Sequence, residues 1–129
     1  MKKKFLIVIA DYYKDISRGL LNSAKEVLPN SSLIKVFSVP GVFEIPVTIS
    51  KNIKKYDGFL ALGCVIKGQT PHFDFISHAS TDAIMKLSIE YRKPIGNGII
   101  TCLNMRQATA RKKKGREAAL AVISVLSQK

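Results

Sequence analysis

A histidine directly after a glycine-containing loop is the feature of this sequence best suited to chemistry. The apolar run 62–66 ends at the loop sequence KGQTP, and His72, one of only two histidines in the chain, comes next. A neutral imidazole can accept and return a proton near pH 7. Loop donors beside a helix start suit an anion, and here they belong to Gly68, Gln69 and Thr70. The pattern indicates proton transfer at His72 beside a bound phosphate, and a histidine that merely caps the helix is the alternative.

Two further loops carry side chains suited to ligand binding. In the segment PGVFEIP, residues 40–46, Phe43 offers an aromatic surface and Glu44 an acceptor for hydroxyl or amine donors. Tyr12 and Tyr13 follow the first apolar run and can stack on a planar ligand. Each feature has a structural alternative, because the first segment also suits a helix start and the two tyrosines also suit the covering of a sheet edge.

Other common site patterns are absent from the sequence. Two separated histidines and two cysteines do not make a metal-ligand set, so we expect no metal. The glycines lack the spacing of dinucleotide and P-loop motifs, and no serine-based nucleophile elbow is present. Cys64 and Cys102 lie in apolar surroundings, which favours buried free thiols and a cytoplasmic protein.

Length, composition and charge narrow the class of protein. The 129 residues, 47% of them hydrophobic, suit one domain over residues 1–129 with one core. No apolar run is long enough to span a bilayer, so we expect no membrane partner. The net charge of +12 is compatible with a nucleic-acid partner. However, the chain has 16 lysines and only 5 arginines, and proteins that recognise bases and phosphates favour arginine, with its planar fork of donors. We therefore expect no nucleic-acid partner.

Strand-like and helix-like segments alternate along the chain, and this order must bring the three loops together. The alternation favours a four-stranded parallel sheet with helices on both faces, a single-domain three-layer α/β sandwich. Ligands bind such sheets beyond the carboxyl ends of the strands, where the three loops then lie. The expected strands are 5–10, 33–39, 58–66 and 94–101. Four helices are expected. The first begins at a cap formed by Asp15, and two more span residues 43–53 and 72–91. The last runs from a cap at Asn104 past Gly115 to about Ser127.

The order of five motifs carries a family resemblance. The motifs are PGVFEIP, ALGCVIKGQTPHFDFIS, GNGIIT, RQATAR and KGREAALA, and in order they cover nearly the whole chain. In these motifs the chain resembles the lumazine synthase family. The resemblance implies a flavodoxin-like fold and a transferase of riboflavin biosynthesis, which condenses 5-amino-6-ribitylamino-uracil with 3,4-dihydroxy-2-butanone 4-phosphate to give 6,7-dimethyl-8-ribityllumazine. It also implies no metal or organic cofactor and a site shared between neighbouring subunits of a pentamer.

The resemblance assigns roles to individual residues. His72 matches the catalytic proton-transfer histidine. The substrate-binding residues that it implies are Tyr12 on the pyrimidine; Val42, Phe43 and Glu44 on the ribityl chain; Val65 and Ile66 in the ring pocket; Gly68, Gln69 and Thr70 on the phosphate; and Arg111 and Lys114 on that phosphate from the adjacent subunit. Asn97 also belongs to the expected pocket, where many members of the family have an aromatic residue.

Two other interpretations stay open. One is a binding protein of the same fold that holds a lumazine or flavin without turnover, and turnover with both substrates separates the two. The other is a flavodoxin-like phosphate-binding or receiver-type domain, suggested by IVIADYY, but the strand ends lack its acidic cluster. The resemblance also bears on the assembly, because shell formation in the family depends on contacts near the turn between Arg111 and Lys114, and that turn is shorter here than in many members. Together with the high charge, this favours a free pentamer over a closed shell.

Overall fold

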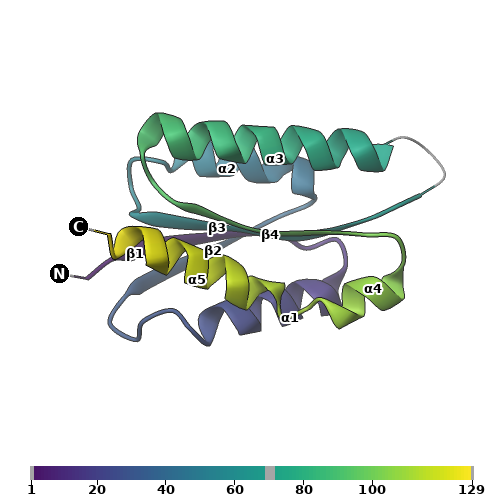
Figure 1. The fold of residues 1–129 in the computed structure, drawn as a ribbon, viewed down its shortest axis with the longest axis horizontal. Helices are drawn as coiled ribbons and strands as arrows, with labels where there is room; N and C mark the ends of the chain where they lie inside the picture. The colour runs from purple at the N-terminus through teal and green to yellow at the C-terminus, as the bar shows by residue number, and fades with distance from the viewer. Residues whose placement is uncertain (1, 69–71, 129) are drawn as a thin grey trace.

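A four-stranded parallel sheet forms the centre of the computed structural model, which describes residues 2–68 and 72–128 (Figure 1). The strand order is β2-β1-β3-β4, and all three pairings are parallel. The elements along the chain are β1 (Lys4–Ala10), α1 (Lys14–Lys25), β2 (Leu33–Val39), the 3-10 turn η1 (Val42–Glu44), α2 (Ile45–Lys51), β3 (Gly58–Ile66), α3 (His72–Tyr91), β4 (Ile95–Cys102), α4 (Met105–Ala110) and α5 (Lys114–Leu126).

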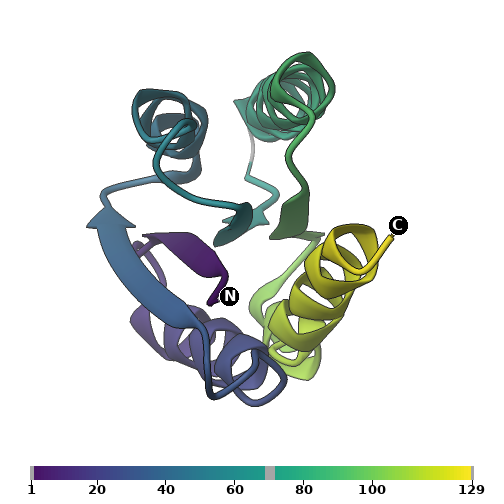
Figure 2. The same ribbon diagram turned by 90° about the vertical axis from the view of Figure 1, so that its left-hand side faces the viewer.

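Helices cover both faces of the sheet. Viewed end-on, α2 and α3 lie on one face, and α1, α4 and α5 lie on the other (Figure 2). The central strand β1 shows the consequence, because Phe5, Ile7 and Ile9 pack toward α1 and α5 while Leu6 and Val8 pack toward α2 and α3. A strand buried on both faces needs a continuous apolar run rather than alternation. The predicted three-layer, flavodoxin-like α/β sandwich is confirmed.

The parallel register places all four carboxyl ends of the strands at one edge of the sheet. Ala10 pairs with Val39 at the end of β1 and β2, and Ile66 pairs with Cys102 at the end of β3 and β4. The loops that follow these strands therefore meet there, at the right-hand end of Figure 1. Within the residues that the structure describes, no helix is long and apolar enough to cross a membrane.

The helix expected from Asn104 to about Ser127 is in fact two helices. Asn104 does cap the first one, since its side chain accepts a hydrogen bond from the Gln107 amide at 2.9 Å. The α-helical pattern then ends at Ala110. Tighter bonds replace it, from the Arg111 amide to the Ala108 carbonyl at 3.1 Å and from the Lys114 amide to the Arg111 carbonyl at 3.0 Å. This turn exposes the Arg111 side chain.

The expected cap at Asp15 is also wrong. The residue before the first turn of α1 is Tyr13, which makes no side-chain capping bond, and Asp15 lies inside that turn. A carboxylate in the first turn still interacts favourably with the positive end of the helix dipole. The predicted helix 72–91 is confirmed as α3. The helix expected over 43–53 is shorter, because η1 occupies its start and Pro46 stands in the first turn of α2.

Candidate functional site

A cavity of about 310 Å³ opens at the carboxyl edge of the sheet. Its lining brings together five of the residues expected at the site: Tyr12, Val42, Val65, Ile66 and His72. They come from the ends of β1 and β3, from η1 and from the start of α3. The remaining lining residues are Tyr13, Gly41, Cys64 and Ile76. The predicted convergence of three loops on one site is therefore present in the fold.

The close approach of η1 to the sheet depends on Gly63. A β-carbon at this position would lie 2.9 Å from Val42 Cγ2 and 3.1 Å from the Ala10 β-carbon. Both separations are shorter than an ordinary van der Waals contact, so a side chain at Gly63 would push η1 outward. The missing side chain lets Val42 form one wall of the cavity while Val65 and Ile66 form another.

The aromatic side of the cavity is formed by two tyrosines. The rings of Tyr12 and Tyr13 meet edge to face, with centroids 4.8 Å apart and planes at 81°. Tyr12 is 74% exposed, which leaves its ring available to a ligand. Tyr13 is half-buried, and its pKa is raised chiefly by loss of hydration and further by neighbouring Tyr12 and Cys64. A flat ring held between Tyr12 and the apolar end of β3 would fit this arrangement.

The proton-transfer candidate stands at the first position of α3. His72 is exposed and lines the cavity. The helix is 20 residues long, and the positive end of its dipole favours an anion beside the imidazole. In the expected phosphate loop, a β-carbon at Gly68 would meet no heavy atom within 4 Å, whereas Gln69 and Thr70 lie outside the described residues. The geometry suits acid–base chemistry next to a bound anion.

Phe43 and Glu44 lie beside the cavity rather than in its wall. Phe43 is 66% exposed. Glu44 is half-buried, and its Oε1 would lie 3.2 Å from a β-carbon at Gly41, which does line the cavity. Glu44 therefore stands at the rim, where a polar chain leaving the cavity would meet it, and Phe43 lies in the chain between Glu44 and Val42 of the cavity wall. The expected contact of Phe43 and Glu44 with a ribityl chain stays a prediction.

Arg111 and Lys114 lie in a second cavity, of about 450 Å³, between β4 and α5. It shares no lining residue with the first. The Arg111 Nη1 donates to the Thr101 carbonyl at 3.1 Å and lies 3.9 Å from Cys102 Sγ, and Lys114 Nζ pairs with Glu117 Oε1 at 3.2 Å. One chain thus does not bring its own Arg111 into the cavity of its own His72.

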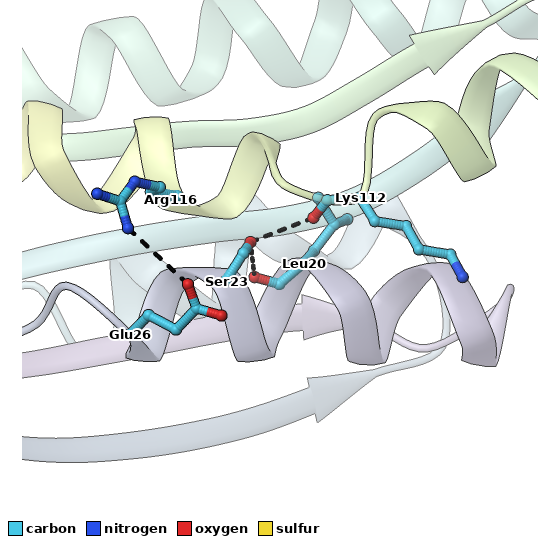
Figure 3. Close-up of polar contacts among 5 residues, drawn as sticks. All are labelled: Leu20, Ser23, Glu26, Lys112 and Arg116. Carbon is cyan, nitrogen blue, oxygen red and sulfur yellow. Dashed lines mark hydrogen bonds and ion pairs between the residues drawn. The ribbon is translucent and has the colours of Figure 1, made fainter.

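The basic segment between α4 and α5 is held against α1. The Ser23 hydroxyl lies between two backbone carbonyls, 3.0 Å from that of Leu20 and 3.1 Å from that of Lys112 (Figure 3). One turn further along α1, Glu26 forms an ion pair with Arg116 of α5, at 3.8 Å. Ser23 is buried, so its hydrogen bonds are shielded from water. This contact fixes the direction in which α5 leaves the turn that carries Arg111.

Asn97 lines neither cavity. Its side chain is exposed on β4, and its Oδ1 accepts a hydrogen bond from the Ile99 amide at 3.0 Å. One chain therefore does not bring Asn97 into the cavity of its own His72, and the expected pocket contact stays a prediction.

Of the four other lining residues, Tyr13 and Gly41 lie in loops already expected to bind a ligand, whereas Cys64 and Ile76 were not predicted. Burial raises the pKa of the Cys64 thiol to about 12, with a further contribution from Cys102, and both cysteines are free and buried as predicted. The sequence does carry a signal for Cys64. This residue lies near the carboxyl end of β3, and a cavity beyond the end of a strand can be lined by residues from both faces of that strand. Among residues 2–68 and 72–128, no group of three or more histidine, cysteine or acidic side chains forms a metal-binding cluster.

Fold and site together define a flavodoxin-like α/β protein with a cavity beyond the carboxyl ends of its strands and a histidine at the start of the helix beside it. Comparison with known proteins is more specific. The family model described as 6,7-dimethyl-8-ribityllumazine synthase matches residues 2–129, and the chain belongs to that family.

Individual relatives agree with this family assignment. The chain is 41% identical to 6,7-dimethyl-8-ribityllumazine synthase of Agrobacterium fabrum, in an alignment that covers 99% of this chain and 95% of the relative. It is 42% identical to the enzyme of that name from Bartonella bacilliformis, covering 93% and 88%. It is 38% identical to the one from Corynebacterium kroppenstedtii, covering 91% and 79%.

Proposed function

We propose that this chain is a transferase of riboflavin biosynthesis. It condenses 5-amino-6-ribitylamino-uracil with 3,4-dihydroxy-2-butanone 4-phosphate and releases 6,7-dimethyl-8-ribityllumazine, phosphate and water. The observation that carries the proposal is the cavity in which Tyr12, Val65 and Ile66 surround space for a flat ring while His72 stands at the start of α3. Membership of the family supports the same reaction.

The roles of the cavity residues follow from the chemistry. The pyrimidine lies against Tyr12 and the apolar end of β3, and its ribityl chain leaves past Phe43 and Glu44 at the rim. The amine attacks the ketone carbon, one water leaves as the Schiff base forms, and phosphate is eliminated. The ribityl-bearing nitrogen then attacks the remaining carbonyl carbon, and the ring closes with loss of a second water. His72 takes the proton from the attacking amine and returns it to a departing oxygen. Holding both substrates in register supplies much of the remaining acceleration.

The phosphate site is completed by a second copy of the chain. His72 and Arg111 lie in separate cavities of one chain, so an arginine beside the phosphate at His72 would have to come from a neighbouring chain. We take the assembly to be a homopentamer. Exposed large apolar side chains on η1, α2 and α3 support burial against neighbours, and they include Phe43, Val47, Phe75, Met85 and Ile89.

The setting we propose is the cytoplasm. Cys64 and Cys102 are both free and buried, which fits a compartment that keeps thiols reduced. Measuring where the tagged protein fractionates in its own cells would test this part of the proposal.

Replacing His72 tests the proposal most directly. His72→Ala should lower kcat by about 10²–10⁴-fold, the usual effect of removing a positioned acid–base group. The matched control is His78→Ala, because His78 is the other histidine of the chain and is exposed on the same helix. Turnover is followed by the absorbance of the lumazine product, and light scattering confirms that each variant has the wild-type mass.

The outcomes separate the enzyme from its main alternative. Wild-type turnover in correctly assembled His72→Ala would contradict the catalytic role of His72. A wild-type protein that binds a lumazine but forms no product from the two substrates would instead be the non-catalytic binding protein of the same fold.

A further inference from the structure

A third cavity, of about 330 Å³, lies at the opposite edge of the sheet and is strongly basic. It shares no lining residue with either of the two cavities described above. Its lining consists of Lys2, Lys3, Lys4, Lys54, Lys55, Lys93, Tyr56 and Asp57. Six of the eight lining residues are therefore lysines, and the reaction proposed for the carboxyl edge uses none of them.

The parallel topology gathers these lysines from three distant parts of the sequence. Lys4 begins β1, Lys54 and Lys55 precede β3, and Lys93 precedes β4. The amino ends of parallel strands meet at one edge, just as the carboxyl ends meet at the other. This amino edge lies at the left-hand end of Figure 1, where both chain termini are drawn.

The positive charge of this cavity is only weakly compensated. Asp57 is its one acidic residue, a formal excess of five positive charges. The Asp57 carboxylate already accepts a hydrogen bond from the Lys4 amide at 2.8 Å. The Lys93 ammonium donates to the Ile53 carbonyl at 2.7 Å, which fixes one lysine at the cavity wall. Among the residues that the structure describes, no ion pair involves any of the six lysines. Unpaired like charges held around a concave surface attract a polyvalent anion.

The residue types indicate what kind of anion would fit. The lining contains no arginine, so the planar fork that recognises a single carboxylate or phosphate by shape is missing. Lysine ammoniums act as point charges on flexible stems and respond to charge density. A cavity of about 330 Å³ holds a short, highly charged molecule.

We propose that this cavity binds a condensed phosphate chain, either inorganic tripolyphosphate or the triphosphate tail of a nucleotide. Adjacent phosphoryl groups place several negative charges within the span of the six lysines. A single orthophosphate can contact only a few of them. Binding here is separate from the phosphate handling proposed for Arg111, because the two cavities lie at different edges of the sheet.

Isothermal titration of the assembled wild-type protein with tripolyphosphate tests the site. At about 0.15 M salt, where the Debye length is about 8 Å, we expect saturable binding of one tripolyphosphate per lysine cavity. Orthophosphate should bind about tenfold more weakly or worse, since it meets fewer charges. Titration with ATP identifies the source of the phosphate chain. Equal affinity for ATP and tripolyphosphate means that only the chain is recognised, whereas tighter binding of ATP means that a nucleotide is the ligand, and both results support the site.

Two triple variants with the same change in charge separate the cavity from general charge effects. The first combines Lys3→Gln, Lys54→Gln and Lys55→Gln, all exposed positions of the cavity. The matched control combines Lys25→Gln, Lys35→Gln and Lys86→Gln, exposed lysines outside it. The first should weaken binding about tenfold or more, because each exposed charge pair contributes a few-fold, and the control should retain most of the affinity.

Arg111→Ala serves as a second control, for phosphate bound at the proposed active site. It should leave tripolyphosphate binding unchanged. The proposal is overturned if wild type shows no saturable binding, if both triple variants lose affinity equally, or if Arg111→Ala abolishes binding while the cavity variant retains it.

Discussion

The contact between α1 and α5 depends on a glycine, and Gly115→Ala tests how strongly it positions the basic turn. Gly115 is buried at the start of α5, directly after Lys114. A β-carbon there would lie 2.0 Å from the Leu20 carbonyl oxygen and 2.8 Å from Ser23 Oγ. Ordinary contact begins at 3.4 Å, so the two helices must separate by about 1.4 Å at this point. The neighbour that must yield is helix backbone, which cannot rotate away.

Three contributions set the expected change in the free energy of unfolding. Overpacking of a tight contact costs about 1–3 kcal/mol. Separation of the helices also lengthens the Ser23–Lys112 hydrogen bond, now 3.1 Å, and its loss costs about 1 kcal/mol. Alanine in place of glycine regains about 1 kcal/mol of helix propensity. The expected net destabilisation is therefore about 1–3 kcal/mol.

Urea unfolding at a fixed protein concentration measures this change, since assembly makes apparent stability depend on concentration. The matched control is Gly19→Ala, in α1 on the other side of the same contact. The atoms nearest to a β-carbon at Gly19 would be Cβ, Cγ and Cδ of Lys112, at 2.8–2.9 Å. Cγ and Cδ can rotate away, and Cβ has to shift by about 0.6 Å, less than half of the 1.4 Å required at Gly115. Gly19→Ala should therefore be clearly less destabilising than Gly115→Ala.

A functional readout accompanies the loss of stability. Movement of α5 displaces the neighbouring Lys114 and the turn that carries Arg111, so the KM for the butanone phosphate should rise more than the KM for the pyrimidine. The reasoning is refuted if Gly115→Ala is as stable as wild type, or if Gly19→Ala and Gly115→Ala cost the same.

Three further predictions concern the phosphate, the assembly and a buried thiol. Arg111→Ala should raise the KM for the butanone phosphate much more than that for the pyrimidine, and equal increases would argue against a phosphate contact. Light scattering should give a mass of about 72 kDa, five times the 14.3 kDa chain, at low and high salt, and a monomer would contradict the shared site. Burial raises the pKa of the Cys64 thiol from 9.0 to about 12. As the pH rises, this thiol therefore loses its proton first in the unfolded chain, and the free energy of unfolding falls between pH 9 and 12. Cys64→Ala should remove the part of this decline that the thiol causes. If the urea midpoints of the variant and the wild type fall in parallel between pH 9 and 11, this expectation is contradicted.

Local patterns determined most of the fold. The strands β2 and β3 and the helix α3 begin and end where the sequence predicts, because continuous apolar runs and helical periodicity report burial on both sides of a sheet. Alternation of strands and helices then requires parallel pairing, and parallel pairing places the loops after β1, β2 and β3 at one edge. The convergence of Tyr12, Val42 and His72 on one cavity follows from that order alone.

Only the tertiary structure decided where the remaining charged residues lie. Neither periodicity nor capping signals mark the break at Arg111, and the close approach of Gly115 to the Leu20 carbonyl just beyond it joins residues 95 positions apart. The separation of Arg111 from His72 is a distance across the sheet, and sequence spacing carries no such information. The same holds for the six lysines at the amino edge, which stand up to 91 positions apart in the chain and meet only because parallel strands begin side by side.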